Sequence, residues 1–361
     1  MITYRSVGLD VHARTIVGCM LDEQTGEVVH RRFGFDFFEV LAWVRSLPGP
    51  VKATYEAGPT GFGLFRLLES SGIRCVVAAP SKLLRPSGDR VKTDARDAQH
   101  LARLLRIDEI TEVRVPSAEE ETARDLVRSR EDTRQDLMAA RHRLSKLLLR
   151  HGFVYSDGAA WTQKHDRWLR GHRSGDLAFQ MTFDGSYEAV LQTVARRDRL
   201  DQAICLMASD SQFTPLVNRL GCLRGIGPLT GFALAVEIND WHRFTGKTIG
   251  AFMGLVPSES SSGQTRSLGS ITKTGNSHAR RLLVEAGWQH RRDYLPGPTS
   301  VMQARWERAP VDVRLRGQAG NERLHRQWLA FTARKKRPVI ANVAVARQLA
   351  GWCWPLAVMD E

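Results

Sequence analysis

Four carboxylates are placed where they could share a divalent cation. Asp94 and Asp97 lie three residues apart at the start of a helical pattern, so both side chains share one helix face. Asp10 and Glu56 each end an apolar run that is typical of a buried strand. Carboxylate oxygens are the ligands that Mg²⁺ prefers, and such sites support phosphoryl transfer. An acidic first helical turn also complements the helix dipole, so the helical pair alone does not decide between these uses.

The elements that must position these carboxylates form an α/β pattern. Three strands come first, and helices and strands then alternate, which gives the order β-β-β-α-β-α-β-α. This is the order of the ribonuclease-H-like fold, in which the first and fourth strands are neighbours. We therefore expect Asp10 and Glu56 side by side. The predicted strands span 4–11, 15–21, 27–33, 51–57 and 73–79, and the predicted helices span 36–47, 59–70 and the segment from Asp94.

A serine-rich stretch in the last third of the chain offers a nucleophile. Residues 254–263 contain Ser260, Ser261 and Ser262, and basic residues lie on both sides of the stretch. We expect a loop here, and a flexible connection is the ordinary use of such a loop. A serine hydroxyl can nevertheless attack a phosphodiester if a metal or an arginine activates it. The residues alone do not indicate which serine would act.

Two glycines before an apolar helix predict a phosphate-binding hairpin. Gly225 and Gly227 flank Ile226, and Thr230 begins the helix that follows. This is the helix-hairpin-helix pattern, which presents backbone N–H groups to a nucleic-acid phosphate. An ordinary tight turn is the alternative. Further candidate nucleic-acid contacts lie downstream and comprise Lys273, Asn276, Arg280 and Arg281.

Composition indicates a polyanionic partner. The 361 residues carry a formal net charge of +13, and only nine of the 52 basic residues are Lys. Arginine favours bidentate contacts with phosphates, although a codon preference could also explain its excess over lysine. No apolar run reaches the roughly 18 residues needed to span a bilayer, so we expect a cytoplasmic protein that joins the nucleoid when bound to DNA. The five cysteines lack ligand spacing, which predicts reduced thiols and no zinc site.

Changes in composition predict three regions, 1–115, 116–210 and 211–361. Residues 117–150 contain no Gly or Pro and carry a narrow apolar stripe, which favours one long helix. This helix would serve as a coiled-coil or dimer arm, or would pack on its own domain. We expect an irregular segment over 152–185, a second helix over 187–207, and a closing helix over 339–354 after a basic loop.

In combination, these motifs resemble a known family. The resemblance rests on Val7–Asp10, Tyr55–Gly61, Lys92–Ala98, the Gly225–Gly227 hairpin, and Ser262 through Asn276 with Arg280. They are similar to the DEDD-type insertion-sequence transposases, also called bridge-RNA-guided serine recombinases, which include relatives that invert pilin genes. The resemblance covers nearly the whole chain, and the ordered combination is more specific than any single motif.

The resemblance implies a RuvC-like domain that holds Mg²⁺ with Asp10, Glu56, Asp94 and Asp97, a helical coiled-coil region, and a mostly helical C-terminal transposase domain. It implies that Ser262 is the nucleophile that forms a covalent phosphoserine link to DNA. It also implies that a structured noncoding guide RNA selects donor and target DNA. Strand exchange between two duplexes then suggests a homo-oligomer, either a dimer or a tetramer.

Three alternatives remain. A metal-dependent nuclease similar to Holliday-junction resolvases would use the same carboxylates to activate water, and would not need Ser262. A nucleic-acid-binding regulator with a vestigial site would need none of these side chains. An actin-like sugar kinase could begin its phosphate loop at Gly8-Leu9-Asp10, but Val11-His12 is a poor continuation of such a loop.

Overall fold

The computed structural model describes residues 4–22, 24–84, 93–262 and 265–359, and for Ser262 and Arg266 it describes the backbone alone. The chain divides into two compact units, Met1–Pro116 and Ser117–Glu361. No helix in the described ranges is both long and apolar enough to cross a membrane. All five cysteines are free thiols, and four of them are buried, as the sequence predicted.

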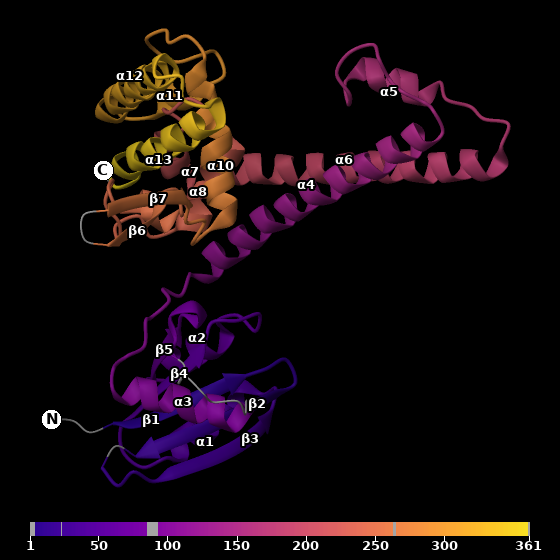
Figure 1. Ribbon diagram of the computed structural model, residues 1–361. Coiled ribbons are helices and arrows are strands. Elements are labelled where there is room, and N and C mark those ends of the chain that lie inside the picture. The colour runs from indigo at the N-terminus through magenta and orange to yellow at the C-terminus, as the bar shows by residue number, and fades with distance from the viewer. Residues whose placement is uncertain (1–3, 23, 85–92, 263–264, 360–361) are drawn as a thin grey trace. The chain divides into compact units, whose positions relative to one another are not determined.

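The N-terminal unit is built on one five-stranded sheet, whose strand order is β3-β2-β1-β4-β5. Strand β1 pairs antiparallel with β2 and parallel with β4, and β2 pairs antiparallel with β3 (Figure 1). The predicted element order is confirmed. In chain order the elements are β1 (Arg5–Val11), β2 (Thr15–Asp22), β3 (Val28–Gly34), α1 (Phe37–Ser46), β4 (Val51–Glu56), α2 (Gly63–Ser70), β5 (Arg74–Ala78), a 3₁₀ turn (Pro80–Lys82) and α3 (Asp94–Arg106).

Helices cover both faces of this sheet. Leu9 and Tyr55 point into a core with α1 and α2, where Trp43 and Leu68 are also buried. Helix α3 packs on the opposite face, and its Ala98 and Ala102 meet Val17, Cys19 and Leu21 of β2 in a smaller cluster. Because side chains alternate along a strand, residues next to Leu9 and Tyr55 in sequence face α3.

Helix α2 is shorter than the sequence predicted. Residues 59–62 form a turn, in which Gly61 has φ 70° and its N–H donates to the carbonyl of Gly58. The Tyr55 hydroxyl donates to the Gly61 carbonyl at 3.2 Å and anchors that turn. The helix therefore begins at Gly63, and the Pro59-Thr60-Gly61 signal marks a turn before it.

The C-terminal unit is mostly helical. Helices α4 and α6 run antiparallel as a long pair, and the other helices form a body with the β6–β7 hairpin (Figure 1). The elements are α4 (Ala118–Arg150), α5 (Gln163–Arg170), α6 (Leu177–Ser209), α7 (Thr214–Leu220), α8 (Pro228–Ile238), α9 (Ile249–Phe252), β6 (Pro257–Ser262), β7 (Thr265–Ile271), α10 (Ser277–Gly287), a 3₁₀ turn (Trp288–Arg291), α11 (Gln303–Arg308), α12 (Val311–Ala333) and α13 (Pro338–Ala357).

The long helix predicted over 117–150 is confirmed. Ser117 caps α4, and its hydroxyl accepts from the Glu120 N–H while the Glu120 carboxylate accepts from the Ser117 N–H. Much of the predicted apolar stripe, including Leu137 and Leu144, is buried against α5 and α6. An ion pair of 2.6 Å between Arg130 and Asp201 adds to that contact.

Two expectations for this unit were wrong, and one helix was not predicted. The segment 152–185, expected to be irregular, contains α5 and the start of α6. Helix α6 begins at Leu177, ten residues before the predicted start, because Phe179 and Phe183 are buried and their packing overrides the helix-weakening Gly185. The serine-rich segment is a strand of a hairpin, since its backbone pairs with β7 although serine is common in loops. The sequence reading also missed α12, whose Gly317 and Gly320 resemble breaks in a helical pattern.

Candidate active site

The ends of β1 and β4 bring two of the predicted carboxylates side by side. Leu9 lies opposite Tyr55 in the parallel β1–β4 pair, so the next residues, Asp10 and Glu56, emerge together at the same edge of the sheet. Both follow core residues and therefore face α3. Both are half-buried.

Close packing of α3 on β1 brings Asp94 to the same edge. A Cβ at Gly8 would overlap the Ala98 carbonyl and the Ala102 N–H, so only glycine allows this approach. Asp94 is one helical turn before Ala98, and Asp10 is two residues beyond Gly8. The two carboxylates consequently meet where α3 begins and β1 ends.

A histidine completes a group of possible metal ligands. One ligand atom from each of Asp10, His12 and Asp94 lies within 4.8 Å of the others. The His12 Nδ1 is 3.4 Å from the Asp10 Oδ1. Carboxylate and imidazole ligands suit a divalent metal ion, so these residues could hold one.

The other two predicted ligands lie close by but outside that group among the described residues. Glu56 is on the neighbouring strand, and Asp97 is in the next turn of α3. Thr93 caps the helix by accepting from the Arg96 N–H at 3.3 Å, which fixes the orientation of the first turn. Lys92, part of the same motif, lies outside the described residues.

A basic pocket of about 610 Å³ borders Asp94. Strand β3 contributes His30, Arg31 and Arg32 to its lining, and α3 contributes Thr93 and Asp94. The pocket places cations beside the carboxylates, as a phosphate backbone approaching a metal site requires. The sequence reading missed His12, Arg31 and Arg32. Two features of the sequence could have indicated them: His12 follows the strand-end Asp10 by two residues, and Arg31 and Arg32 form a basic run within a predicted strand.

The predicted phosphate-binding hairpin lies between α7 and α8. Gly225 has φ +87°, and a Cβ there would collide with the backbone of Ala286, so the turn needs glycine. Helix α8 begins at Pro228 after the N-cap Gly227, and no side chain caps it. Its first N–H groups, including that of Thr230, lack intrahelical acceptors and could receive a phosphate.

The serine-rich strand places the candidate nucleophiles in a hairpin. Ser262 ends β6 and pairs with Thr265 of β7, while its side chain and residues 263–264 lie outside the described part of the chain. Ser260 is exposed, and the Ser261 hydroxyl donates to the Glu259 carboxylate at 2.8 Å. Strand alternation puts Ser260 and Ser261 on opposite sides of the hairpin.

The downstream candidates for nucleic-acid contact have different surroundings. Lys273 is exposed with φ 55°. Asn276 caps α10 by accepting from the Ala279 N–H at 2.9 Å. Arg280 donates to the Thr274 carbonyl at 2.8 Å, and Arg281 pairs with Glu131 and Glu285. The Arg280 contact ties the segment after β7 to α10, and the Arg281 contacts tie α10 to α4. Nucleic-acid binding by these residues stays a prediction.

A second group of carboxylates lies inside the C-terminal unit. The Glu237 side chain is only 1% exposed, and Arg128, Asn276 and His278 all hydrogen-bond to it. Burial raises the pKa of Glu237, but the hydrogen bonds from His278, Arg128 and Asn276 outweigh burial and lower the pKa to about 2. His278 also lies 3.7 Å from Glu131.

Comparisons with known proteins identify the family of the chain. A DEDD-type transposase family model matches residues 7–153, and a model for the transposase IS116/IS110/IS902 family matches residues 217–296. The chain is 37% identical to the putative transposase y4qE of Sinorhizobium fredii, over 84% of this chain and 74% of that protein. It is 31% identical to the transposase for insertion sequence element IS1533 of Leptospira borgpetersenii, over 92% of this chain and 97% of the relative.

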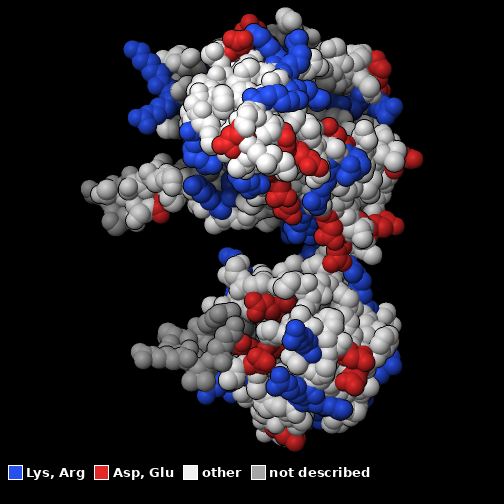
Figure 2. Space-filling view, turned by 90° about the vertical axis from the view of Figure 1, so that its right-hand side faces the viewer, with Lys and Arg blue, Asp and Glu red and all other residues white. Residues whose placement is uncertain are grey.

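A transposase is an enzyme that acts on DNA, and the basic charge of this chain suits that partner. Figure 2 shows Lys and Arg side chains over both units on the face that it presents, with acidic side chains among them. The matched regions include Asp10, Glu56, Asp94 and Asp97 in the first unit, and Ser262 in the second. The chain is therefore a member of the IS110/IS116 family of insertion-sequence transposases.

Proposed function

We propose that this transposase cuts and rejoins DNA strands through a phosphoserine at Ser262, assisted by a divalent ion, Mg²⁺, at the end of a RuvC-like sheet. The observation that carries the proposal is the group formed by Asp10, His12 and Asp94. The strand order β3-β2-β1-β4-β5 supports the RuvC-like assignment, because it puts the end of β1 beside that of β4.

Asp10 and Asp94 would hold the ion, with Glu56 and Asp97 as the further ligands. Bound there, the ion would neutralise charge that develops on the scissile phosphate. His12 is 57% exposed and adjoins Asp10, so its imidazole could complete the ligands of the ion. Arg31 and Arg32 line the neighbouring pocket and would hold the DNA backbone in register.

The chemical step is a displacement at phosphorus. The Ser262 Oγ forms a bond to the phosphorus as the bond from phosphorus to the 3′ oxygen breaks, and the hydroxyl proton passes to that leaving oxygen. The 3′ hydroxyl of a second strand then attacks the phosphoserine and releases Ser262 with its proton restored. Bond energy is conserved over the two steps, so strands rejoin without a nucleotide cofactor.

The two halves of this site come from different units of the chain. The carboxylates lie in Met1–Pro116, and Ser262 lies in Ser117–Glu361. We propose that the carboxylates of one subunit act with Ser262 of another in a dimer or tetramer. The α4–α6 pair supports such an arm, because Met138 and Leu149 of α4 are 47% and 52% exposed.

Guidance by a structured noncoding RNA is the proposed source of site selection. The net charge of +13 supports binding to a partner with many phosphates, as such an RNA would be. The Gly225–Gly227 hairpin with Thr230, at the start of α8, is one proposed phosphate-binding element. A second is formed by residues at and before the start of α10, namely Lys273, Asn276, Arg280 and Arg281. Both belong to the last of the three proposed regions, 1–115, 116–210 and 211–361. Such contacts read backbone and shape, and leave sequence to base pairing.

Trapping the protein–DNA adduct tests the proposal. The full chain is incubated with DNA from the ends of its own insertion sequence, RNA transcribed from that element and Mg²⁺, and is then run on a denaturing gel. We expect a covalent adduct that Ser262→Ala abolishes. Ser260→Ala and Ser261→Ala are the matched controls and should retain it. An adduct that persists in Ser262→Ala contradicts the assignment.

A metal-dependent nuclease is the second candidate, because the metal ligands gather in one unit without any contribution from Ser262. In that case the carboxylates would activate water, and cleavage would leave no protein on the DNA. Ser262→Ala would then cut as fast as the parent chain. Mixing Asp94→Ala with Ser262→Ala subunits separates the schemes further, since a composite site predicts partial rescue.

A further inference from the structure

The C-terminal unit contains a groove of about 1130 Å³ that the proposed chemistry does not use. Helix α13 forms one wall, α9 and the base of the β6–β7 hairpin form another, and the end of α12 closes it. Glycines make the junction possible: a Cβ at Gly351 would lie 2.9 Å from the Gly246 carbonyl, and one at Gly250 would touch the aliphatic stem of Arg347. The groove is thus built into the fold.

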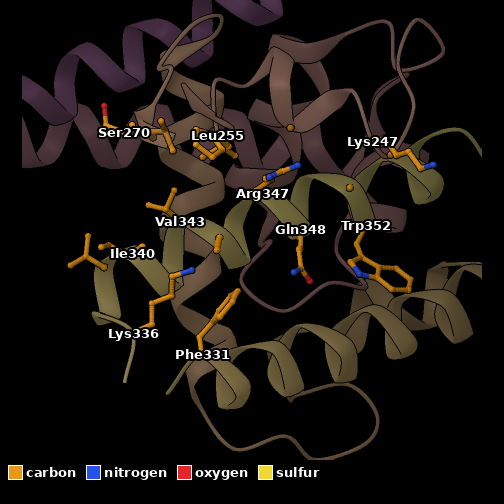
Figure 3. A pocket seen from close by; sticks show the side chains of 18 residues that line it. Lys247, Leu255, Ser270, Phe331, Lys336, Ile340, Val343, Arg347, Gln348 and Trp352 are labelled. Atoms are coloured by element: carbon orange, nitrogen blue, oxygen red, sulfur yellow. The ribbon is translucent and has the colours of Figure 1, made fainter. Parts of the chain in front are cut away.

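The lining is apolar and aromatic with a basic rim. Val339 and Ile340 at the start of α13 are 67% and 51% exposed, which is unusual for large aliphatic side chains. The lining includes Lys247, Lys336 and Arg347, and none of the described residues in it is Asp or Glu. Figure 3 shows Lys336 with Ile340 at one end, Lys247 towards the other, and Arg347 between them.

Two aromatic rings are held in place along this groove. The Phe331 ring is buried, with the Lys336 Nζ 4.5 Å from its centroid. The Trp352 ring packs against α12 where Gly320 leaves room, since a Cβ there would be 3.1 Å from the indole. Phe331 with Lys336 is therefore part of the apolar wall, whereas the half-buried Trp352 ring, with cations in the same lining, is the feature that can receive a nucleobase and its phosphate.

We infer that this groove binds an unpaired DNA strand. A duplex stacks its bases internally and presents phosphates, so it would leave the apolar walls in water, whereas an unpaired strand offers both base faces and phosphates. Pro257 and Ile271 line the groove at the base of the hairpin that carries Ser262. A strand in the groove would therefore contact the base of the hairpin whose far end carries the proposed nucleophile.

This inference rests on the proposed function only in taking DNA as the substrate. Its test is fluorescence anisotropy of the full chain with a labelled oligothymidylate of about twelve nucleotides, which is within the usual site size. The same-length duplex and an oligouridylate are measured in parallel. We expect the unpaired DNA to bind more tightly than the duplex, with a salt dependence set by the rim cations.

Charge reversal provides the main variant, because the rim residues are exposed and tolerate change. Lys247→Glu with Arg347→Glu should weaken oligothymidylate binding about tenfold or more and reduce the salt slope by about 0.7 for each phosphate that the variant no longer neutralises. Arg316→Glu, exposed on α12 outside the lining, is the matched control and should change little. Ile340→Asp tests the apolar wall and should weaken unpaired DNA more than duplex.

Three results would overturn the inference. Groove variants could bind oligothymidylate as the parent chain does. The oligouridylate could bind far more tightly than the DNA strand, which would assign the groove to RNA. Ile340→Asp could instead shift the oligomeric state with strand affinity unchanged, which would assign the groove to a second copy. The adduct assay is separate, so loss of the phosphoserine proposal would leave these binding results standing.

Discussion

This transposase has two clusters of carboxylates with a histidine, one that we propose binds a metal ion and one that links helices. In the N-terminal unit, Asp10 and Asp94 meet His12 at a half-open sheet edge, and the Asp10 side chain is 15% exposed. In the C-terminal unit, His278 lies between Glu131 and Glu237.

Arginines hold the second group together. Arg128 forms a two-point contact with Glu237, and Arg134 does the same with Glu131, where Arg281 joins it. Guanidinium groups occupy the lone pairs that a metal would need, so this second group links α4, α8 and α10 as structure. A histidine among carboxylates that arginines already bind is therefore not evidence of a metal site.

The largest expected effect is a loss of DNA cleavage when a carboxylate of the N-terminal cluster is replaced. Asp94→Asn should reduce DNA cleavage on the order of a thousandfold, because the amide is a poor metal ligand and several kcal/mol of charge stabilisation are lost. The free energy of unfolding should change by less than about 1 kcal/mol, since Asp94 is at a helix start and half-buried. Cleavage assays and denaturant unfolding on the same preparation check both statements. Activity within threefold of the parent chain would exclude Asp94 from the site.

Glu237→Gln should show the reverse pattern. The fall in the pKa of Glu237 from the ordinary value of 4.5 to about 2 corresponds to about 3 kcal/mol of stability at neutral pH. The variant loses most of it in urea unfolding, whereas Glu322→Gln, at a 49%-exposed carboxylate on α12, should change little. Equal stability of the two variants would contradict the structural role of Glu237.

The pH dependence of unfolding tests the same carboxylate independently. Its pKa is lower in the folded chain than in the unfolded chain, so its contribution is complete above pH 4.5 and declines as the pH falls towards 2. The parent chain should therefore lose stability over this window more steeply than Glu237→Gln. Parallel curves for the two proteins would show that Glu237 does not carry this dependence.

Gly8→Ala tests the packing of α3 on β1, which brings Asp94 to Asp10. The added Cβ meets the backbone of α3, which cannot move aside without leaving β1, so we expect a loss of about 2 kcal/mol in unfolding free energy and weaker metal binding. Gly34→Ala is the matched control, because a Cβ added at this position on β3 would have no other atom within 4 Å. Similar stability of the two variants would mean that α3 does not depend on Gly8.

The smallest expected effect concerns the histidine. His12→Gln should weaken Mn²⁺ binding about tenfold, because one ligand of the group is replaced by a weaker donor. Isothermal titration of the metal-free chain measures this change directly. His142→Gln, an exposed histidine on α4, should bind Mn²⁺ as the parent chain does. Loss of affinity in both variants would point to a nonspecific effect.

Sequence reasoning predicted the sheet better than the residues around its edge. Alternation and turn signals located all five strands, and the order predicted Asp10 beside Glu56. It did not predict His12 near Asp94, because that distance depends on how closely α3 approaches Gly8. Tertiary contact also decided the serine segment, whose strand character comes from pairing with β7.

A manganese-anomalous diffraction map of crystals soaked in Mn²⁺ would show directly which of the two carboxylate clusters binds a divalent ion. We expect an ion bound by Asp10 and Asp94 at the end of β1, with His12 beside it, and none between Glu131 and Glu237. An ion at the arginine-bound glutamates, with none at the sheet edge, would contradict this expectation.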